Sequence, residues 1–364
     1  MKKKFYGMLA AVLIASCICV PQVKVQAEDV YDDSDWSDSW YDNDVTPIPD
    51  LTNVTIDKIS QIGYAQKNGY FYGSEMPTYK FTLQNTPCLL NDYDDGVRFS
   101  AECSSIKINV YASLENNVIS LTPDVVGKTT VTITINNKTF QVNINTIGVD
   151  VPNSLLLSTK QKKQITVKGV NGIKWKSSNP SVVSVSQNGT VYAKKTGNAV
   201  LMGTLGDLQL GCAVSVVTPA RKRTVQKAIQ IAKTCTYSQP KRMQEKFYDC
   251  SSLVWKSYHK NGVNFGMAYY APVAADMGKW CVQHKKLVSG GLSQANIQNM
   301  KLNPGDVMFE TGQKNGRYKG IYHVEMITGY IFYGFDGNGK AELGIQWAAG
   351  DEKYYPMGQM VGRP

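Results

Sequence analysis

Residues 173–203 read IKWKSSNPSVVSVSQNGTVYAKKTGNAVLMG, the clearest structural signal in the chain. Apolar and polar residues alternate in IKWKSS, SVVSVS and TVYAK, which is the period of β-strands with one buried face. The QNG sequence between the last two segments is typical of a hairpin turn, because glycine accepts the positive φ that a tight turn needs. Strands at this short spacing predict an antiparallel β-sandwich.

The same pattern extends toward the N-terminus. VTITI and FQVNINTI alternate apolar and polar residues on either side of the turn NNKT, and the strand order here echoes the end of the neighbouring segment. We therefore expect two β-sandwiches, a more divergent one over residues 51–148 and a second over residues 149–218.

The pattern changes at Thr218–Pro219, where a helical period begins. RKRTVQKAIQIAKTC has apolar residues at the spacing of one helix face, namely Val225, Ala228, Ile229 and Ala232. The strand-like segments DVMFE, HVEMITGYIFYGF and AELGIQW follow. Helices mixed with strands predict an α+β domain over residues 219–364.

The N-terminus has the three parts of a secretion signal, which we place at residues 1–27. MKKK is the charged region, FYGMLAAVLIASCICV the apolar core, and VQA the cleavage site that ends at Ala27. An alternative is a lipoprotein signal in which Cys17 of IASC is lipidated. A membrane anchor is less favoured, because the apolar run is short and is soon interrupted by Pro21. No other segment predicts a membrane span.

Charge is unevenly distributed along the chain. Residues 28–50 carry nine acidic residues and no Lys or Arg, and they predict a disordered spacer. Residues 51–364 carry a net charge of +15. A secreted chain with this positive charge favours binding to anionic polymers, here those of the cell wall. The alternative is that the excess charge serves solubility alone. No Arg/aromatic platform for single-stranded nucleic acid is evident.

Six cysteines follow the signal, and their spacing is not that of a metal site. There is no CxxC and the three histidines are scattered, so we expect no metal and no cofactor. Cys88 and Cys103 are close enough in sequence to form a local disulfide. Cys212 is expected to be a small apolar residue on a strand.

One thiol, in EKFYDCSSLVWKSYHKNG at residues 245–262, stands where a helix should begin. Asp249 is a good N-cap, which places Cys250 in the first turn. Unpaired N–H groups and the helix dipole favour a thiolate there, as a nucleophile requires. The alternative is an inert buried thiol. A base must lie within hydrogen-bond reach, and His323, at the start of a strand, is better placed than His259 or His284.

Two resemblances add to this interpretation. Residues 149–218 resemble a group 2 bacterial Ig-like domain through their tryptophan, the SSNPSV turn and the NGTVYAKKTG hairpin. Residues 219–364 resemble NlpC-type cell-wall cysteine peptidases of the papain-like superfamily. Five motifs follow in the order of that family: AIQIAKTCTY, FYDCSSLVWKSY, LNPGDVMFE, YHVEMITGY and GIQWAAG.

The peptidase resemblance implies specific roles. It makes Cys250 the nucleophile, His323 the general base and Gln346 the third residue, which would fix the imidazole tautomer. It places Tyr237 beside the oxyanion, next to the backbone N–H of Cys250. Asp249 would meet the free amine of a stem peptide.

The sequence also departs from that family. Ser252 stands where glycine is usual, and SQPKRMQEK replaces a WGG motif. Glu325 replaces a glycine two residues after His323, on the same strand face, where it would narrow the cleft or contact substrate.

These observations predict a secreted thiol hydrolase that cleaves peptidoglycan stem peptides, between D-glutamate and the diamino acid as such enzymes do. The Ig-like modules would be spacers or wall-binding arms. An N-acetylmuramoyl-L-alanine amidase using the same residues is one alternative. An inactive Ig-like binding or adhesion protein is another.

Overall fold

The computed structural model describes residues 48–66, 76–165, 167, 170–206, 208–312, 314–350 and 355–364. They belong to one compact unit that spans Pro47–Pro364. The expected signal with Cys17, and the acidic spacer up to residue 47, lie outside the described residues. Within the described ranges, no helix has the length and apolar character needed to cross a membrane.

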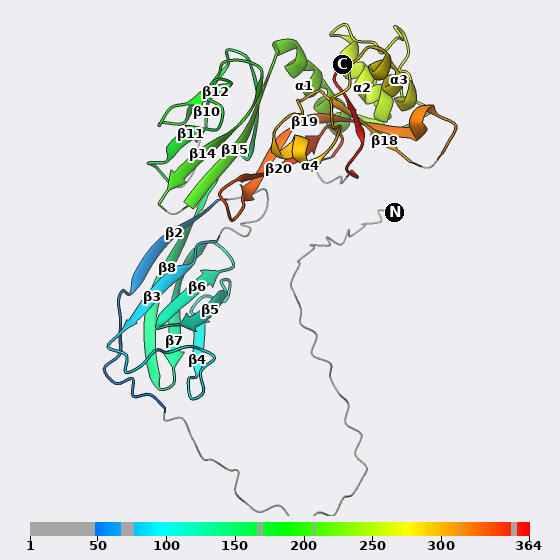
Figure 1. The fold of residues 1–364 in the computed structure, drawn as a ribbon. Coiled ribbons are helices and arrows are strands. Elements are labelled where there is room, and N and C mark those ends of the chain that lie inside the picture. The colour runs from blue at the N-terminus through cyan, green and yellow to red at the C-terminus, as the bar shows by residue number, and fades with distance from the viewer. Residues whose placement is uncertain are drawn as a thin grey trace, which may run out of the picture. The chain divides into compact units, whose positions relative to one another are not determined.

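The first part of the described chain is a β-sandwich (Figure 1). One sheet has the order β1-β3-β6-β5, with bounds Thr55–Ile56, Tyr79–Gln84, Val118–Pro123 and Val110–Glu115. The other has the order β2-β8-β7-β4, with bounds Ser60–Gln66, Lys138–Val149, Gly127–Ile135 and Phe99–Cys103. Alternate residues of the strands are buried in a core that both sheets share, including Phe81, Ile119, Ile133 and Val142.

The expected disulfide between Cys88 and Cys103 is wrong, because both residues are free thiols in the structure. Cys103 ends β4 in one sheet, whereas Cys88 lies in the loop after β3, which belongs to the opposite sheet. Nearness in sequence therefore does not place these two cysteines as a bonded pair.

A second sandwich follows, and this confirms the sequence-based prediction of Ig-like β-sandwiches. Its small sheet has the order β10-β13-β12, with bounds Lys162–Gln164, Thr190–Ala193 and Val183–Val185. Its larger sheet has the order β11-β14-β15-β9, with bounds Lys174–Ser177, Gly197–Leu205, Leu208–Val217 and Ser154–Ser158. The hairpin turn at QNG places Gly189 at φ +80°, and Trp175 is buried in the core.

The C-terminal part combines helices with an antiparallel sheet. The sheet has the order β20-β19-β18-β21, with bounds Ala341–Trp347, Ile321–Phe335, Val307–Thr311 and Met360–Gly362. The helices are α1 (Pro219–Thr234), α2 (Cys250–His259), α3 (Ala274–Gln283), α4 (Gln294–Gln298) and the 3₁₀ turn η1 (Tyr318–Gly320). Two short strands, β16 (Thr236–Tyr237) and β17 (Phe247–Tyr248), pair in parallel just before α2.

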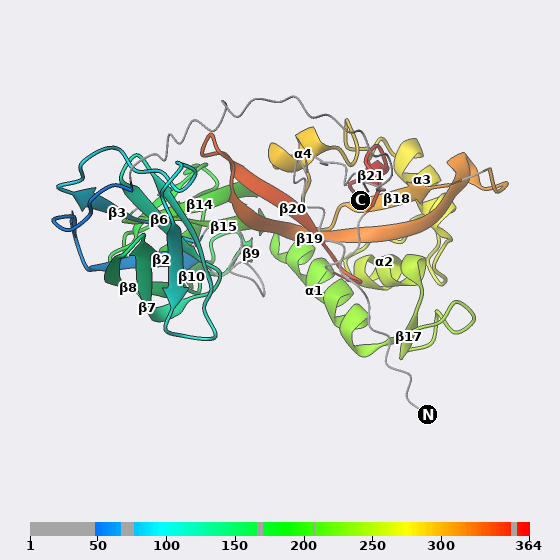
Figure 2. The same cartoon turned by 90° about the horizontal axis from the view of Figure 1, so that it is seen from below.

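The sheet separates two hydrophobic cores. Val324 and Met326 of β19 face a core shared with α1, α2 and α3, while Ile327 faces another core shared with α4. Figure 2 shows α1 and α2 on one side of β19 and α4 on the other. The N-terminus of α2 therefore abuts the sheet near the start of β19.

The second sandwich and the C-terminal part share a core at the far end of β19. Phe332 of β19 is fully buried, and its backbone N–H donates to the carbonyl oxygen of Asn153 at 3.0 Å. Its ring lies so close to Gly211 of β15 that a Cβ on Gly211 would be 2.2 Å from it. Gly211 also exchanges two hydrogen bonds with the buried Gln66 side chain of the first sandwich, at 2.9 and 3.0 Å. Three segments of the chain thus meet at Gly211.

Candidate active site

The sequence around Cys250 starts a helix through a reciprocal cap. The Asp249 carboxylate accepts from the backbone N–H of Ser252 at 2.7 Å, and the Ser252 hydroxyl accepts from the backbone N–H of Asp249 at 2.8 Å. This capping box fixes where α2 begins, and so it fixes Cys250 as its first residue. Ser252, which departs from the expected glycine, completes the box.

A buried arginine holds this helix start in place. The Arg242 guanidinium donates to the Asp249 carboxylate at 3.1 Å, to the Ser251 hydroxyl at 2.8 Å and to the Ala271 carbonyl oxygen at 2.6 Å. It also lies over the ring of Tyr270, 4.8 Å from the centroid. Arg242 belongs to SQPKRMQEK, the segment that stands in place of the WGG motif. This segment therefore supplies the arginine that binds the N-cap residue Asp249.

Replacing Arg242 should destabilise the domain strongly. Arg242→Ala leaves the Asp249 carboxylate buried without its counter-ion, which typically costs about 3–5 kcal/mol. Chemical denaturation followed by fluorescence would measure the loss. The matched control is Lys241→Ala, since Lys241 is the exposed neighbour and should change the unfolding free energy by no more than about 0.5 kcal/mol. Equal stability of the two variants would contradict this role of Arg242.

Cys250 meets β19 at the residue that follows His323. The backbone amide of Val324 donates toward the Cys250 sulfur. β20 pairs with β19 from Ile327 onward, so this stretch of β19 lies beyond the paired part of β20. The structure therefore brings the candidate nucleophile to the histidine end of the strand.

The environment of Cys250 favours the neutral thiol. Burial raises the pKa of the Cys250 thiol, and the nearby negative charges of Asp249 and Glu325 raise it further. The N–H groups of Val324 and Ser251 oppose this shift but do not overcome it. The expected thiolate stabilisation at the helix start is thus outweighed, and a base must take the proton when the thiol reacts.

Tyr237 lies where an oxyanion site is expected. The backbone N–H of Cys250 donates toward the Tyr237 hydroxyl, and burial raises the pKa of this tyrosine. Its ring packs edge-on against Tyr248, with centroids 5.5 Å apart, and Tyr237 itself is 52% exposed. An exposed hydroxyl beside a helix N-terminal amide can donate to a developing negative charge.

The ring of His323 is flanked by two groups of the same end of the sheet. Its Nε2 lies 3.3 Å from the Tyr355 hydroxyl and 3.9 Å from the Glu325 carboxylate. The rings of His323 and Tyr355 stack with centroids 6.0 Å apart. No sequence motif points to Tyr355, whereas Glu325 lies on the strand face of His323, as its spacing of two residues predicts.

The prediction that Gln346 orients His323 is wrong. Gln346 lies opposite Gly329, six residues along β19 from His323. Its side-chain oxygen accepts from the Ser154 hydroxyl of the second sandwich at 2.9 Å. Successive residues of a strand advance by about 3.3 Å, so six residues separate the two side chains far beyond hydrogen-bond reach.

Two further expectations need correction. Asp249 is 5% exposed and its carboxylate is engaged by Arg242 and the helix cap, so it is not placed to meet the amine of a substrate. Glu325 is 2% exposed and accepts from the backbone N–H of Met326 at 3.0 Å. It lies beneath the surface and is not available for contact with a substrate there.

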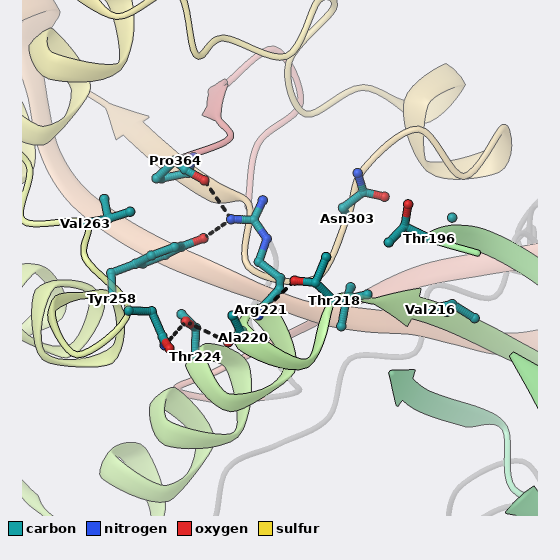
Figure 3. Close-up of a pocket in the computed structure, with 13 residues that line it drawn as sticks. Thr196, Val216, Thr218, Ala220, Arg221, Thr224, Tyr258, Val263, Asn303 and Pro364 are labelled. Atoms are coloured by element: carbon teal, nitrogen blue, oxygen red, sulfur yellow. Dashed lines mark hydrogen bonds between the residues drawn. The ribbon is translucent and has the colours of Figure 1, made fainter. Parts of the chain in front are cut away.

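A cavity of about 420 Å³ lies elsewhere, at the start of α1 (Figure 3). Arg221 points along it and donates to the carbonyl oxygen of Pro364 at 2.8 Å and to the hydroxyl of Tyr258. Neither Cys250 nor His323 lines this cavity. Among the described residues, no group of three or more His, Cys, Asp or Glu side chains is arranged to hold a metal ion.

Comparison with known proteins identifies one part of the chain. The sequence model of the bacterial Ig-like domain (group 2) matches residues 156–215. This region is therefore a bacterial Ig-like domain of group 2, in agreement with the resemblance noted from its sequence. No curated protein matches the chain.

Solved structures with similar parts share low sequence identity with this chain. A bacterial Ig-like domain containing GH10 xylanase from termite gut is 24% identical over 18% of each chain, with a TM-score of 0.17. Invasin, a bacterial integrin-binding protein, is 13% identical over 46% of this chain and 40% of its own, with a TM-score of 0.29. Domains 5–6 of the S-layer protein SbsC are 19% identical over 47% and 99%, with a TM-score of 0.19. This chain spans less than half the length of the first two.

Proposed function

We propose that residues 219–364 are a papain-like cysteine peptidase domain of the NlpC type, and that the protein hydrolyses stem peptides of peptidoglycan. One observation supports this above the others: a thiol at a helix N-terminus is packed against the strand residue that follows a histidine. Tyr237 stands beside the backbone amide of that same thiol residue. Acyl transfer to sulfur needs a thiol, a base close to it and a donor for the oxyanion, and Cys250, His323 and Tyr237 are the candidates for these three roles.

The geometry supports a two-step reaction. The Cys250 sulfur attacks the amide carbon while its proton passes to His323, and the carbonyl oxygen becomes negatively charged. The hydroxyl of Tyr237, which accepts from the backbone N–H of Cys250, donates its own proton toward that oxygen and stabilises it. His323 then protonates the leaving amine and the C–N bond breaks, leaving a thioester. Water, deprotonated by His323, releases the acid and restores the thiol.

The remaining parts of the chain fit an extracellular role. The basic charge of residues 51–364 favours contact with anionic wall polymers, and the Ig-like modules would serve as spacers or wall-binding arms. We place the protein outside the cell, free or associated with the wall.

Digestion of purified peptidoglycan by the full chain, read by mass spectrometry, tests this function. An endopeptidase of this kind leaves stems that end at D-glutamate attached to the glycan and releases peptides that begin with the diamino acid. Intact stem peptides together with free disaccharide polymer would identify an N-acetylmuramoyl-L-alanine amidase instead. If no product forms, the chain is not a wall hydrolase, and a binding or adhesion role takes its place.

A further inference from the structure

We infer that Tyr355, assisted by Glu325, positions His323 in the place expected for Gln346. This inference deepens the proposed function and rests on it for the identity of the reaction. The ring must present one nitrogen to the thiol and hold the other in a fixed hydrogen bond. Nε2 is the nitrogen that faces Tyr355, and in this inference Nδ1 is the nitrogen that takes the proton of Cys250.

The distances separate the roles of the two side chains. The Tyr355 hydroxyl, 3.3 Å from Nε2, is at the long end of hydrogen-bond range, whereas the Glu325 oxygen at 3.9 Å is beyond it. Tyr355 therefore supplies the directional contact. Glu325 supplies a buried negative charge that favours the imidazolium formed when the thiol loses its proton.

The surroundings of Tyr355 make it a suitable support. Tyr355 is buried, and its ring meets Trp347 edge-on with centroids 4.8 Å apart. Burial raises the pKa of Tyr355, as do the charges of Glu325 and Glu310, so its hydroxyl stays protonated. A neutral hydroxyl held by a packed ring can accept the Nε2 proton without carrying charge itself.

The test compares Tyr355→Phe and Glu325→Gln with Gln346→Ala as the control. Two rates are measured: turnover of peptidoglycan, and alkylation of Cys250 by iodoacetamide near neutral pH, located by peptide mass mapping. The second needs no substrate. Tyr355→Phe keeps the packed ring, so it should lower kcat and the alkylation rate on the order of 10- to 100-fold, with KM unchanged. Glu325→Gln should lower kcat by less than Tyr355→Phe does, because it removes a charge that favours the imidazolium but keeps the contact of the Tyr355 hydroxyl with Nε2.

The outcomes distinguish this inference from the proposed function. If the wild type digests no peptidoglycan but Tyr355→Phe still slows alkylation, Tyr355 positions His323 and peptidoglycan is not the substrate. If Tyr355→Phe alkylates at the wild-type rate, or Gln346→Ala loses as much as Tyr355→Phe, the positioning role is overturned. A KM change with kcat intact would also overturn it, because that pattern indicates lost binding rather than a misplaced base.

Discussion

Cys250→Ala should abolish the hydrolysis of peptidoglycan. The substitution removes the sulfur that forms the thioester, and loss of a nucleophile of this kind lowers kcat by at least about 10⁴-fold. The helix start should survive, because the cap is made by Asp249 and Ser252 and not by the cysteine side chain. Release of peptide products over time, measured by mass spectrometry, gives the rate.

A matched control is Cys235→Ala. Cys235 is half-buried at the end of α1, and its thiol contacts the carbonyl oxygen of Glu245 at 3.6 Å. It lies outside the constellation of Cys250 and His323, so its loss should leave the rate within about two-fold, the scatter of a neutral substitution. If Cys250→Ala hydrolysed peptidoglycan at the full rate, Cys250 would not be the nucleophile. Thermal unfolding of both variants shows whether each one is folded.

Gly211→Val should destabilise the second sandwich and the C-terminal part together. A side chain at Gly211 would lie 2.2 to 2.4 Å from three atoms of the buried Phe332 ring. Overpacking costs about 1–3 kcal/mol and occasionally more, and the hydrogen bonds with Gln66 would be strained as well. For a loss of about 3 kcal/mol we expect Tm to fall by about 6–12 °C.

Gly337→Val serves as the control for that experiment. Gly337 is exposed in the turn between β19 and β20, and an added Cβ would meet nothing within 4 Å. Its Tm should stay within about 2 °C of the wild type. Calorimetry resolves the two regions if they unfold separately. A lowered transition confined to the sandwich would contradict the shared core around Phe332.

Local patterns in the sequence predicted those strands and helix ends that depend on interactions between residues close in sequence. Alternation predicted the strands of both sandwiches, and Asp249 before an apolar run predicted the start of α2, because a cap depends on residues three positions apart. The expected nearness of Cys250 and the His323 end of β19 came from the order of the peptidase motifs rather than from a local pattern.

The residues that hold His323 and Asp249 in place could not be predicted in the same way. Whether Gln346 or Tyr355 reaches His323 depends on the register between β19 and β20, which contains two irregularities and is set by packing far along the chain. Arg242 carried a weak signal, a basic residue seven positions before the expected N-cap Asp249. Its partners at Ala271 and Tyr270 come from a distant loop, so the pairing is visible only in three dimensions.

The core shared by β15 and β19 limits where this chain can be cut when parts of it are to be transferred to another protein. The sequence suggests a domain boundary near residue 218, where the alternating pattern of β-strands ends and a helical pattern begins. A fragment cut there would expose Val200 and Ala213, whose cover is supplied by Leu343, Phe332 and their neighbours. In any graft or exchange the second sandwich and the C-terminal part must therefore stay together, and Gln66 links the first sandwich to the same core.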